Sequence, residues 1–146
     1  MRDRVIFIFL CFMLSLRAEA TDYTSMIHDA KQASANCTGY EVDDANIKRR
    51  TDESIRCGVD AFAPLIDIRF QRYYQKNFHK TKDHDFVLLR FVIEPSGDVS
   101  VHLKENKLSG DSDSFAEDLV SILSAMKFPN FDGAQWDGDY PINFFN

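Results

Sequence analysis

Histidine and aspartate side chains that could bind a metal ion lie in three stretches of this chain. The charged stretch at 79–85 places His79 and His84 beside aspartates, and imidazole and carboxylate groups bind divalent metal ions well. The spacing of these residues matches no standard metal-binding pattern. The aspartate-rich stretches at 111–114 and 132–139 resemble fragments of calcium-binding loops, but neither has the alternating ligands and terminal glutamate of a complete loop. We therefore expect turns and helix caps there, and no metal site.

The signature of nucleophilic catalysis is also missing from the sequence. Serine, histidine and aspartate are all present, but no segment has the Gly-x-Ser-x-Gly pattern of a nucleophile elbow. We therefore expect a protein that is not an enzyme and that holds no cofactor.

The first twenty residues have the layout of a secretory signal peptide. Arginines precede an apolar run at 5–16, and the Ala-Glu-Ala sequence that ends at Ala20 fits the small-x-small pattern of a cleavage site. The apolar run has twelve residues, whereas a membrane-spanning helix requires about 20. We expect cleavage after Ala20, a mature chain of residues 21–146 with no membrane span, and a periplasmic location.

Charge excludes one class of partner. The full chain carries a net charge of −6, and residues 1–20 contribute +1 of it, so the expected mature chain carries −7. The one basic run, 48–50, is flanked by acidic residues on both sides. A chain without a basic patch is a poor nucleic-acid binder.

The cysteines predict a disulfide between Cys37 and Cys57. Cys11, the third cysteine, lies in the expected signal peptide, and an even count in an exported chain favours a disulfide over free thiols. Neither cysteine has a histidine or another cysteine at metal-ligand spacing. Closing a loop of about 20 residues stabilises a fold by roughly 3 kcal/mol on the chain-entropy model.

Helices are expected before the middle of the chain. In residues 21–59 we expect short helices at about 25–36 and 51–57, with too few large apolar residues to form a core alone. Between 60 and 78, apolar residues recur at spacings of three and four, which predicts an amphipathic helix of about four turns. Asp60 is the expected N-cap of that helix.

A hairpin is expected in the middle of the chain. The stretch at 86–94 is apolar except at Arg90 and Glu94, which fall on the same set of alternate residues, as expected for one outward face of a strand. Apolar and polar residues alternate at 99–104, and the Pro-Ser-Gly-Asp sequence at 95–98 is typical of a tight turn. The side chains expected to face the core are those of Val87, Leu89, Phe91, Ile93, Val99, Val101 and Leu103.

A second amphipathic helix and a last strand are expected to complete the chain. Ser114 and Glu117 have the spacing of a capping box, and Phe128-Pro129 ends the helix. The expected buried stripe is Phe115, Leu119, Ile122, Leu123 and Met126. A loop with two Asp-Gly turns is expected at 130–139, followed by a strand from Tyr140 to Phe145.

This order of elements predicts an α+β fold. Helix, strand, strand, helix and strand, with a hairpin in the middle, form a two-layer domain with a small antiparallel sheet. We divide the chain into a signal peptide at 1–20, a helical, disulfide-linked N-terminal segment at 21–59 and one domain at 60–146.

Four short motifs resemble those of the C-terminal domains of TonB, of AgmX-type gliding-motility proteins and, more loosely, of TolA. They are RFVI at 90–93, PSGDV at 95–99, FP at 128–129 and PINF at 141–144. The resemblance covers residues 60–146. It implies a stand-alone TonB/TolA C-terminal-like domain, a link to envelope transport, and a last strand that takes up a partner peptide by strand addition.

The last strand is therefore the candidate binding site. A strand at a sheet edge offers unpaired backbone groups to an extended peptide. The candidate partner-binding residues are Trp136, Tyr140, Ile142, Asn143, Phe144 and Phe145. Trp136 fits two interpretations, a side chain that closes the open end of the core or a surface anchor for the partner.

A structural accessory protein is the alternative. In this interpretation residues 21–57 cover the sheet edge, Phe145 packs on the back of the sheet, and the protein docks inside an envelope complex. Exposure of the last strand distinguishes the two interpretations.

Overall fold

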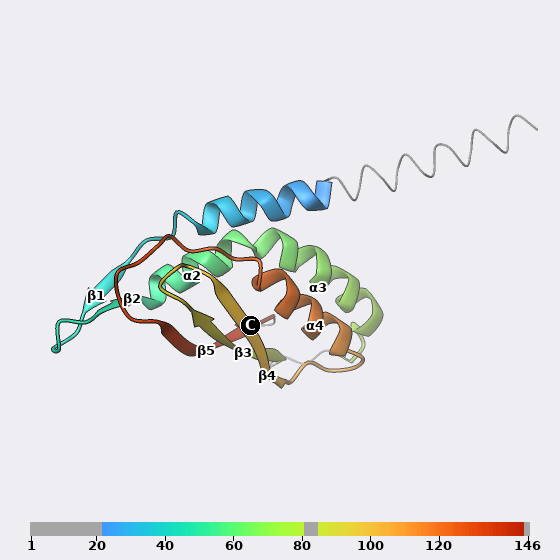
Figure 1. The fold of residues 1–146 in the computed structure, drawn as a ribbon. Coiled ribbons are helices and arrows are strands. Elements are labelled where there is room, and N and C mark those ends of the chain that lie inside the picture. The colour runs from blue at the N-terminus through green and yellow to red at the C-terminus, as the bar shows by residue number, and fades with distance from the viewer. Residues whose placement is uncertain (1–21, 81–84, 145–146) are drawn as a thin grey trace, which may run out of the picture.

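The computed structural model of the chain describes residues 22–80 and 85–144 (Figure 1). The expected signal peptide at 1–20 and the candidate site residue Phe145 lie outside the described residues. The elements in chain order are a helix over 22–34, β1 (Tyr40–Val42), β2 (Lys48–Arg50), α2 (Asp52–Ala61), α3 (Ala63–Asn77), β3 (Phe86–Ile93), β4 (Val99–Asn106), α4 (Asp113–Leu123) and β5 (Trp136–Asn143).

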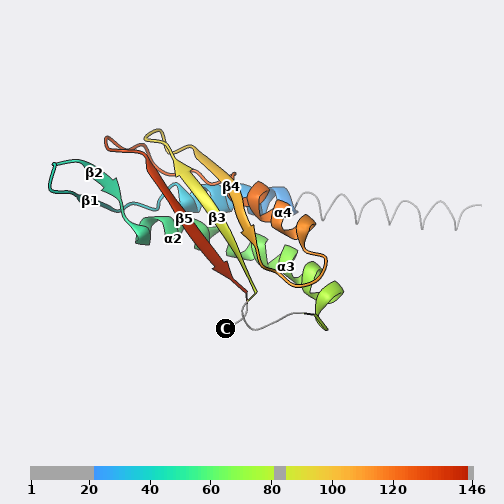
Figure 2. The same cartoon turned by 90° about the horizontal axis from the view of Figure 1, so that it is seen from below.

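The predicted α+β fold class is confirmed. The strands form two antiparallel sheets, a two-stranded sheet of β1 and β2 and a three-stranded sheet in the order β4-β3-β5. Figure 2 shows the three longer strands side by side, with α3 and α4 on one face of the sheet. The opposite face of the sheet is covered by no described element.

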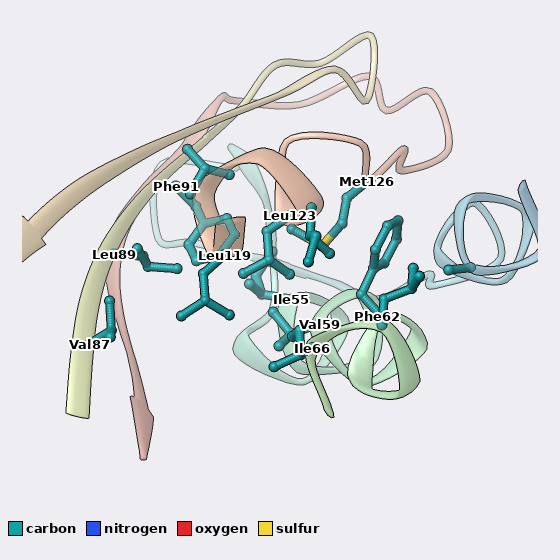
Figure 3. Packing of buried hydrophobic residues seen from close by; sticks show 14 of the residues in the cluster. Ile55, Val59, Phe62, Ile66, Val87, Leu89, Phe91, Leu119, Leu123 and Met126 are labelled. Carbon is teal, nitrogen blue, oxygen red and sulfur yellow. The ribbon is translucent and has the colours of Figure 1, made fainter. Parts of the chain in front are cut away.

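The central strand β3 supplies the sheet's half of the core. Its side chains alternate between the two faces, and those of Val87, Leu89, Phe91 and Ile93 are 0 % exposed, as predicted. Figure 3 shows the side chains of Val87, Leu89 and Phe91 opposite those of Leu119 and Leu123 from α4. The helices pack against β3 because their apolar stripes have no other surface of this size to bury against.

The prediction that Leu103 faces the core is wrong. Its side chain is 42 % exposed, although it pairs with the buried Leu89 across the sheet. The register shifts at this point, because Leu88 pairs with Glu105 and Lys104 is left as the extra residue of a bulge. A bulge bends an edge strand and increases its twist, so the bulged strand carries Leu103 away from the helices.

The N-terminal segment contains a β-hairpin that its sequence did not predict. Asp43 organises the turn, because its carboxylate accepts hydrogen bonds from the backbone amides of Ala45 and Ile47, each at 2.9 Å. The hairpin is fixed to the rest of the fold by Arg50, whose guanidinium donates to the Pro129 carbonyl at 2.8 Å. The same guanidinium lies over the rings of Phe128 and Phe131, at 5.4 and 4.8 Å from their centroids.

Two predicted helix caps are wrong. Asp60 lies in the last turn of α2, and α3 begins at Ala63 after a sharp break at Phe62. Ser114 lies inside α4, which begins at Asp113 without a side-chain cap. Pro64 is in the first turn of α3, where a missing amide proton costs no helical hydrogen bond.

The predicted disulfide is confirmed. Cys37 follows the helix at 22–34, Cys57 lies in α2, and their Cα atoms are 5.7 Å apart. Ala30 and Ile55 belong to the same buried cluster as Leu89. The N-terminal segment therefore contributes to the core of the α+β domain.

None of the helices described over 22–80 and 85–144 is both long and apolar enough to cross a lipid bilayer.

Candidate functional site

The last strand is longer than predicted. It begins at Trp136 and not at Tyr140, so the predicted turn at Asp137-Gly138 is wrong. Arg90 of β3 donates to the Asp137 carboxylate at 2.8 and 2.6 Å. This pairing across the sheet outweighs the local preference of Asp-Gly for a turn.

Ion pairs also hold β5 on the solvent-facing side of the sheet. Lys104 of β4 donates to the Asp139 carboxylate at 2.6 Å, reaching across the face of β3. The hydrogen bonds from Arg90 lower the pKa of the Asp137 carboxyl below its ordinary value. The Asp137 carboxylate is therefore charged at neutral pH, and the hydrogen bonds to Asp137 and Asp139 tie the edge strand to its neighbours.

Large apolar side chains of the described part of β5 lie on one face only. Trp136, Tyr140 and Ile142 are half-buried and pack against the core, as does Phe144 directly after the strand. A Cβ atom on Gly138 would lie 2.6 Å from the Trp136 ring. The ring therefore folds over Gly138 and closes one end of the core, which agrees with the first of the two interpretations for Trp136.

The backbone of β5 presents its outer edge at alternate residues. The Phe144 amide donates to the Asp85 carbonyl, on the β3 side, at 3.4 Å. Because the amides of an extended strand alternate in direction, the Asn143 amide points away from β3. Pro141 has the same orientation, which fits the rule that proline in a sheet occupies a position whose nitrogen faces outward at an edge.

This outer edge pairs with no strand in the described parts of the chain, because β5 pairs with β3 alone. The N-terminal segment forms hydrogen bonds to other parts of the fold. The Ser34 hydroxyl donates to the Lys127 carbonyl at 3.1 Å, and the Ala134 amide donates to the Lys48 carbonyl at 2.9 Å. Figure 2 shows the hairpin of β1 and β2 projecting past the end of the three-stranded sheet, and not along β5.

A groove runs between β5 and the helices. Its volume is about 400 Å³. Its helical side is lined by Val59, Asp60, Ala63, Ile66, Asp67 and Phe70, and its strand side by Tyr140, Pro141, Ile142, Asn143 and Phe144. Ile66 is buried and forms part of the floor, whereas Asp60 and Asp67 are exposed at the rim.

Aromatic stacking closes one end of the groove. The rings of Phe70 and Phe144 are parallel, with centroids 4.9 Å apart. The ring of Phe70 also packs against that of Phe115 in α4, with centroids 5.9 Å apart. This cluster anchors the C-terminal end of β5 to α3, so the strand side of the groove has a fixed position.

Comparison with known proteins gives no assignment. No protein-family model, curated protein or solved structure matches the chain. Within the described residues, no group of three or more metal-ligating side chains is close enough together to hold a metal ion. Of the residues first considered as ligands, His84 lies outside the described residues.

The structure brings together four of the six residues predicted to bind a partner. Tyr140, Ile142, Asn143 and Phe144 line the groove, whereas Trp136 lies at the far end of β5. Sequence analysis missed the helical side of the groove entirely. Ile66 and Phe70 belong to an apolar stripe that predicts burial, and nothing in that pattern shows that the stripe extends past the edge of the sheet.

Proposed function

We propose that this protein is an exported, periplasmic and non-enzymatic binding module of the TonB/TolA C-terminal type. It captures an extended segment of a protein partner by strand addition at β5. The observation that carries this proposal is the outward orientation of the Asn143 amide, beside a groove at an unpaired sheet edge.

The chemistry of strand addition matches this edge. An added strand gains affinity from main-chain hydrogen bonds and selectivity from pockets for every second side chain. The backbones of Asp139 and Asn143 offer donors and acceptors on the outer side, and Pro141 offers a carbonyl only. The groove receives the side chains that point toward α3.

The order of elements adds further support. Helix α3, the hairpin of β3 and β4, helix α4 and strand β5 follow one another in the order that the motif resemblance implies. Two of the motifs are also in contact, because the Phe128 amide donates to the Gly97 carbonyl at 2.9 Å.

Proline substitutions test the proposal. Asn143→Pro removes an outward donor from β5 and should abolish or strongly reduce recovery of partners from envelope extract. The matched control is Leu103→Pro on β4, the opposite edge of the same sheet, where the exposed Leu103 pairs with Leu89. Circular dichroism establishes that both variants are folded. If Asn143→Pro recovers the same partners as the wild type, β5 is not the binding edge.

A second candidate function is docking through the N-terminal hairpin. Three large apolar side chains of the hairpin are exposed, those of Tyr40, Val42 and Ile47, at 57 %, 52 % and 41 %. Clustered exposed apolar side chains are typical of interaction sites. This candidate keeps the docking role of the structural accessory protein, although β1 and β2 do not pair with the β5 edge. The double variant Tyr40→Ser with Val42→Ser should abolish partner recovery in the same assay if docking, and not strand addition, is the function.

A further inference from the structure

We propose that the segment captured at β5 is cationic, with basic side chains on both of its faces and apolar side chains on the face that meets the groove. This inference rests on the proposed function and adds the chemistry of the partner. It follows from the carboxylates that flank the β5 edge on both sides of the sheet.

The groove side combines an apolar floor with an acidic rim. Val59, Ala63 and Ile66 offer aliphatic contacts, and Asp60 and Asp67 stand exposed beside them. No lysine, arginine or histidine lines the groove as the structure describes it. Neither rim carboxylate forms an ion pair with a described residue. A bound lysine or arginine can therefore lay its aliphatic stem on the floor and place its charge at the rim.

The solvent-facing side of β5 also carries two carboxylates. Asp137 and Asp139 alternate with Tyr140 and Gly138 along β5, so both carboxylates lie on the face opposite the groove. Their side chains remain 37 % and 43 % exposed in spite of their pairs with Arg90 and Lys104. A carboxylate can accept several hydrogen bonds. Residues directly opposite them on an added strand would gain from a positive charge.

Like charge excludes the opposite kind of partner. An acidic segment would place its carboxylates beside Asp60 and Asp67 at the groove rim, where no described ion pair offsets their charge, and such like-charge contacts are destabilising. The net charge of −6 for the whole chain acts in the same direction over longer distances. The edge therefore selects against acidic strands as well as for basic ones.

Two synthetic peptides test the inference on the full mature chain. A peptide that repeats Lys-Lys-Val-Val carries lysine and valine on both faces when it is extended, and a peptide that repeats Glu-Glu-Val-Val is its acidic match. We expect the basic peptide to bind at least about tenfold more tightly at low ionic strength. The preference should shrink in about 1 M salt, where the screening length is about 3 Å.

A charge-matched pair of variants assigns the effect to the groove. Asp60→Asn with Asp67→Asn should weaken binding of the basic peptide by about three- to tenfold, the scale of two partly exposed ion pairs. Asp22→Asn with Glu117→Gln removes the same charge from exposed sites that do not line the groove and should leave the affinity unchanged. Equal losses in both double variants would mean that only net charge matters, and would overturn the inference.

Failure of the inference and failure of the proposed function give different results. If both peptides bind equally and Asn143→Pro weakens both, the edge captures strands without charge preference and only the inference fails. If neither peptide binds, or if Asn143→Pro changes the affinity of neither, strand addition at β5 itself is wrong.

Discussion

Gly97 and Phe128 meet backbone to backbone. The Phe128 amide donates to the Gly97 carbonyl at 2.9 Å, and a Cβ atom on Gly97 would lie 1.9 Å from the Phe128 carbonyl oxygen. Gly97 also has a φ of +84°, which only glycine adopts without strain. The turn of the β3–β4 hairpin is therefore joined to the segment that follows α4. The contact leaves no room for a side chain at position 97.

Gly97→Ala should lower the free energy of unfolding by about 2 kcal/mol or more. A residue other than glycine in the left-handed region costs about 1–3 kcal/mol, and the clash with a backbone oxygen adds to this cost. Urea unfolding measures the change. The control is Ser96→Ala, an exposed position in the same turn, which should cost less than about 1 kcal/mol. Equal effects at both positions would show that this contact is unimportant.

Removing the disulfide with Cys37→Ala and Cys57→Ala should destabilise the fold by about 3 kcal/mol, because the unfolded chain regains the freedom of a loop that spans 20 residues. Thermal unfolding with and without reductant provides the measurement. Reductant should destabilise the wild type and leave the double variant unchanged. A double variant as stable as the oxidised wild type contradicts this prediction.

Buried and exposed leucines should respond differently to truncation. Leu89→Ala and Leu123→Ala should each cost about 2–5 kcal/mol, because both side chains are 0 % exposed. Leu103→Ala should cost less than about 1 kcal/mol, because the bulge leaves this leucine exposed. Chemical denaturation of all three variants decides the point, and a large loss at Leu103 would mean that this residue is part of the core.

Two neighbouring prolines should separate the inner and outer sides of β5. Ile142→Pro should cost about 3 kcal/mol or more, because the Ile142 amide faces β3, where Ile142 pairs with Val87. Asn143→Pro should cost less than about 1 kcal/mol, because its amide faces away from the sheet. Denaturant melts compare them. A larger loss for Asn143→Pro than for Ile142→Pro would mean that the Asn143 amide faces β3 and that the outward amides belong to the other set of residues.

Acid should weaken the ion pair between Asp137 and Arg90. The folded state holds the pKa of the Asp137 carboxyl below its ordinary value of about 3.9, chiefly through the hydrogen bond from Arg90. The contribution of this pair is therefore fully present above about pH 4 and is lost as the pH falls through the folded-state pKa. Asp137→Asn should make stability less dependent on pH in that window. Carbon NMR titration of the carboxyl reads the pKa directly, and an ordinary value would contradict the prediction.

The elements that sequence analysis predicted well have strong local patterns. In β3 one set of alternate residues contains Arg90 and the other set is entirely apolar, and the apolar stripe of α4 follows the helical period, so their buried faces could be assigned residue by residue. The disulfide followed from counting cysteines. These features depend on residues close to one another in the chain, or on composition alone.

The elements that it missed depend on contacts between distant residues. The β1 and β2 strands have three residues each and owe their position to Arg50, which reaches Pro129 and the rings of Phe128 and Phe131. The first half of β5 contains an Asp-Gly sequence that favours a turn, and Arg90 overrides it from the neighbouring strand. Local propensity is worth little against such pairing.

The sequence by itself determined the fold class, the two faces of the central strand and the disulfide, and it pointed to the last strand as the candidate binding site. Only the tertiary structure decided which edge β5 occupies, which way the Asn143 amide points and what lines the groove beside it. The reason is physical. The alternation of a strand fixes which side chains share a face, whereas the order of strands in a sheet and the free side of an edge are set by packing across the whole domain.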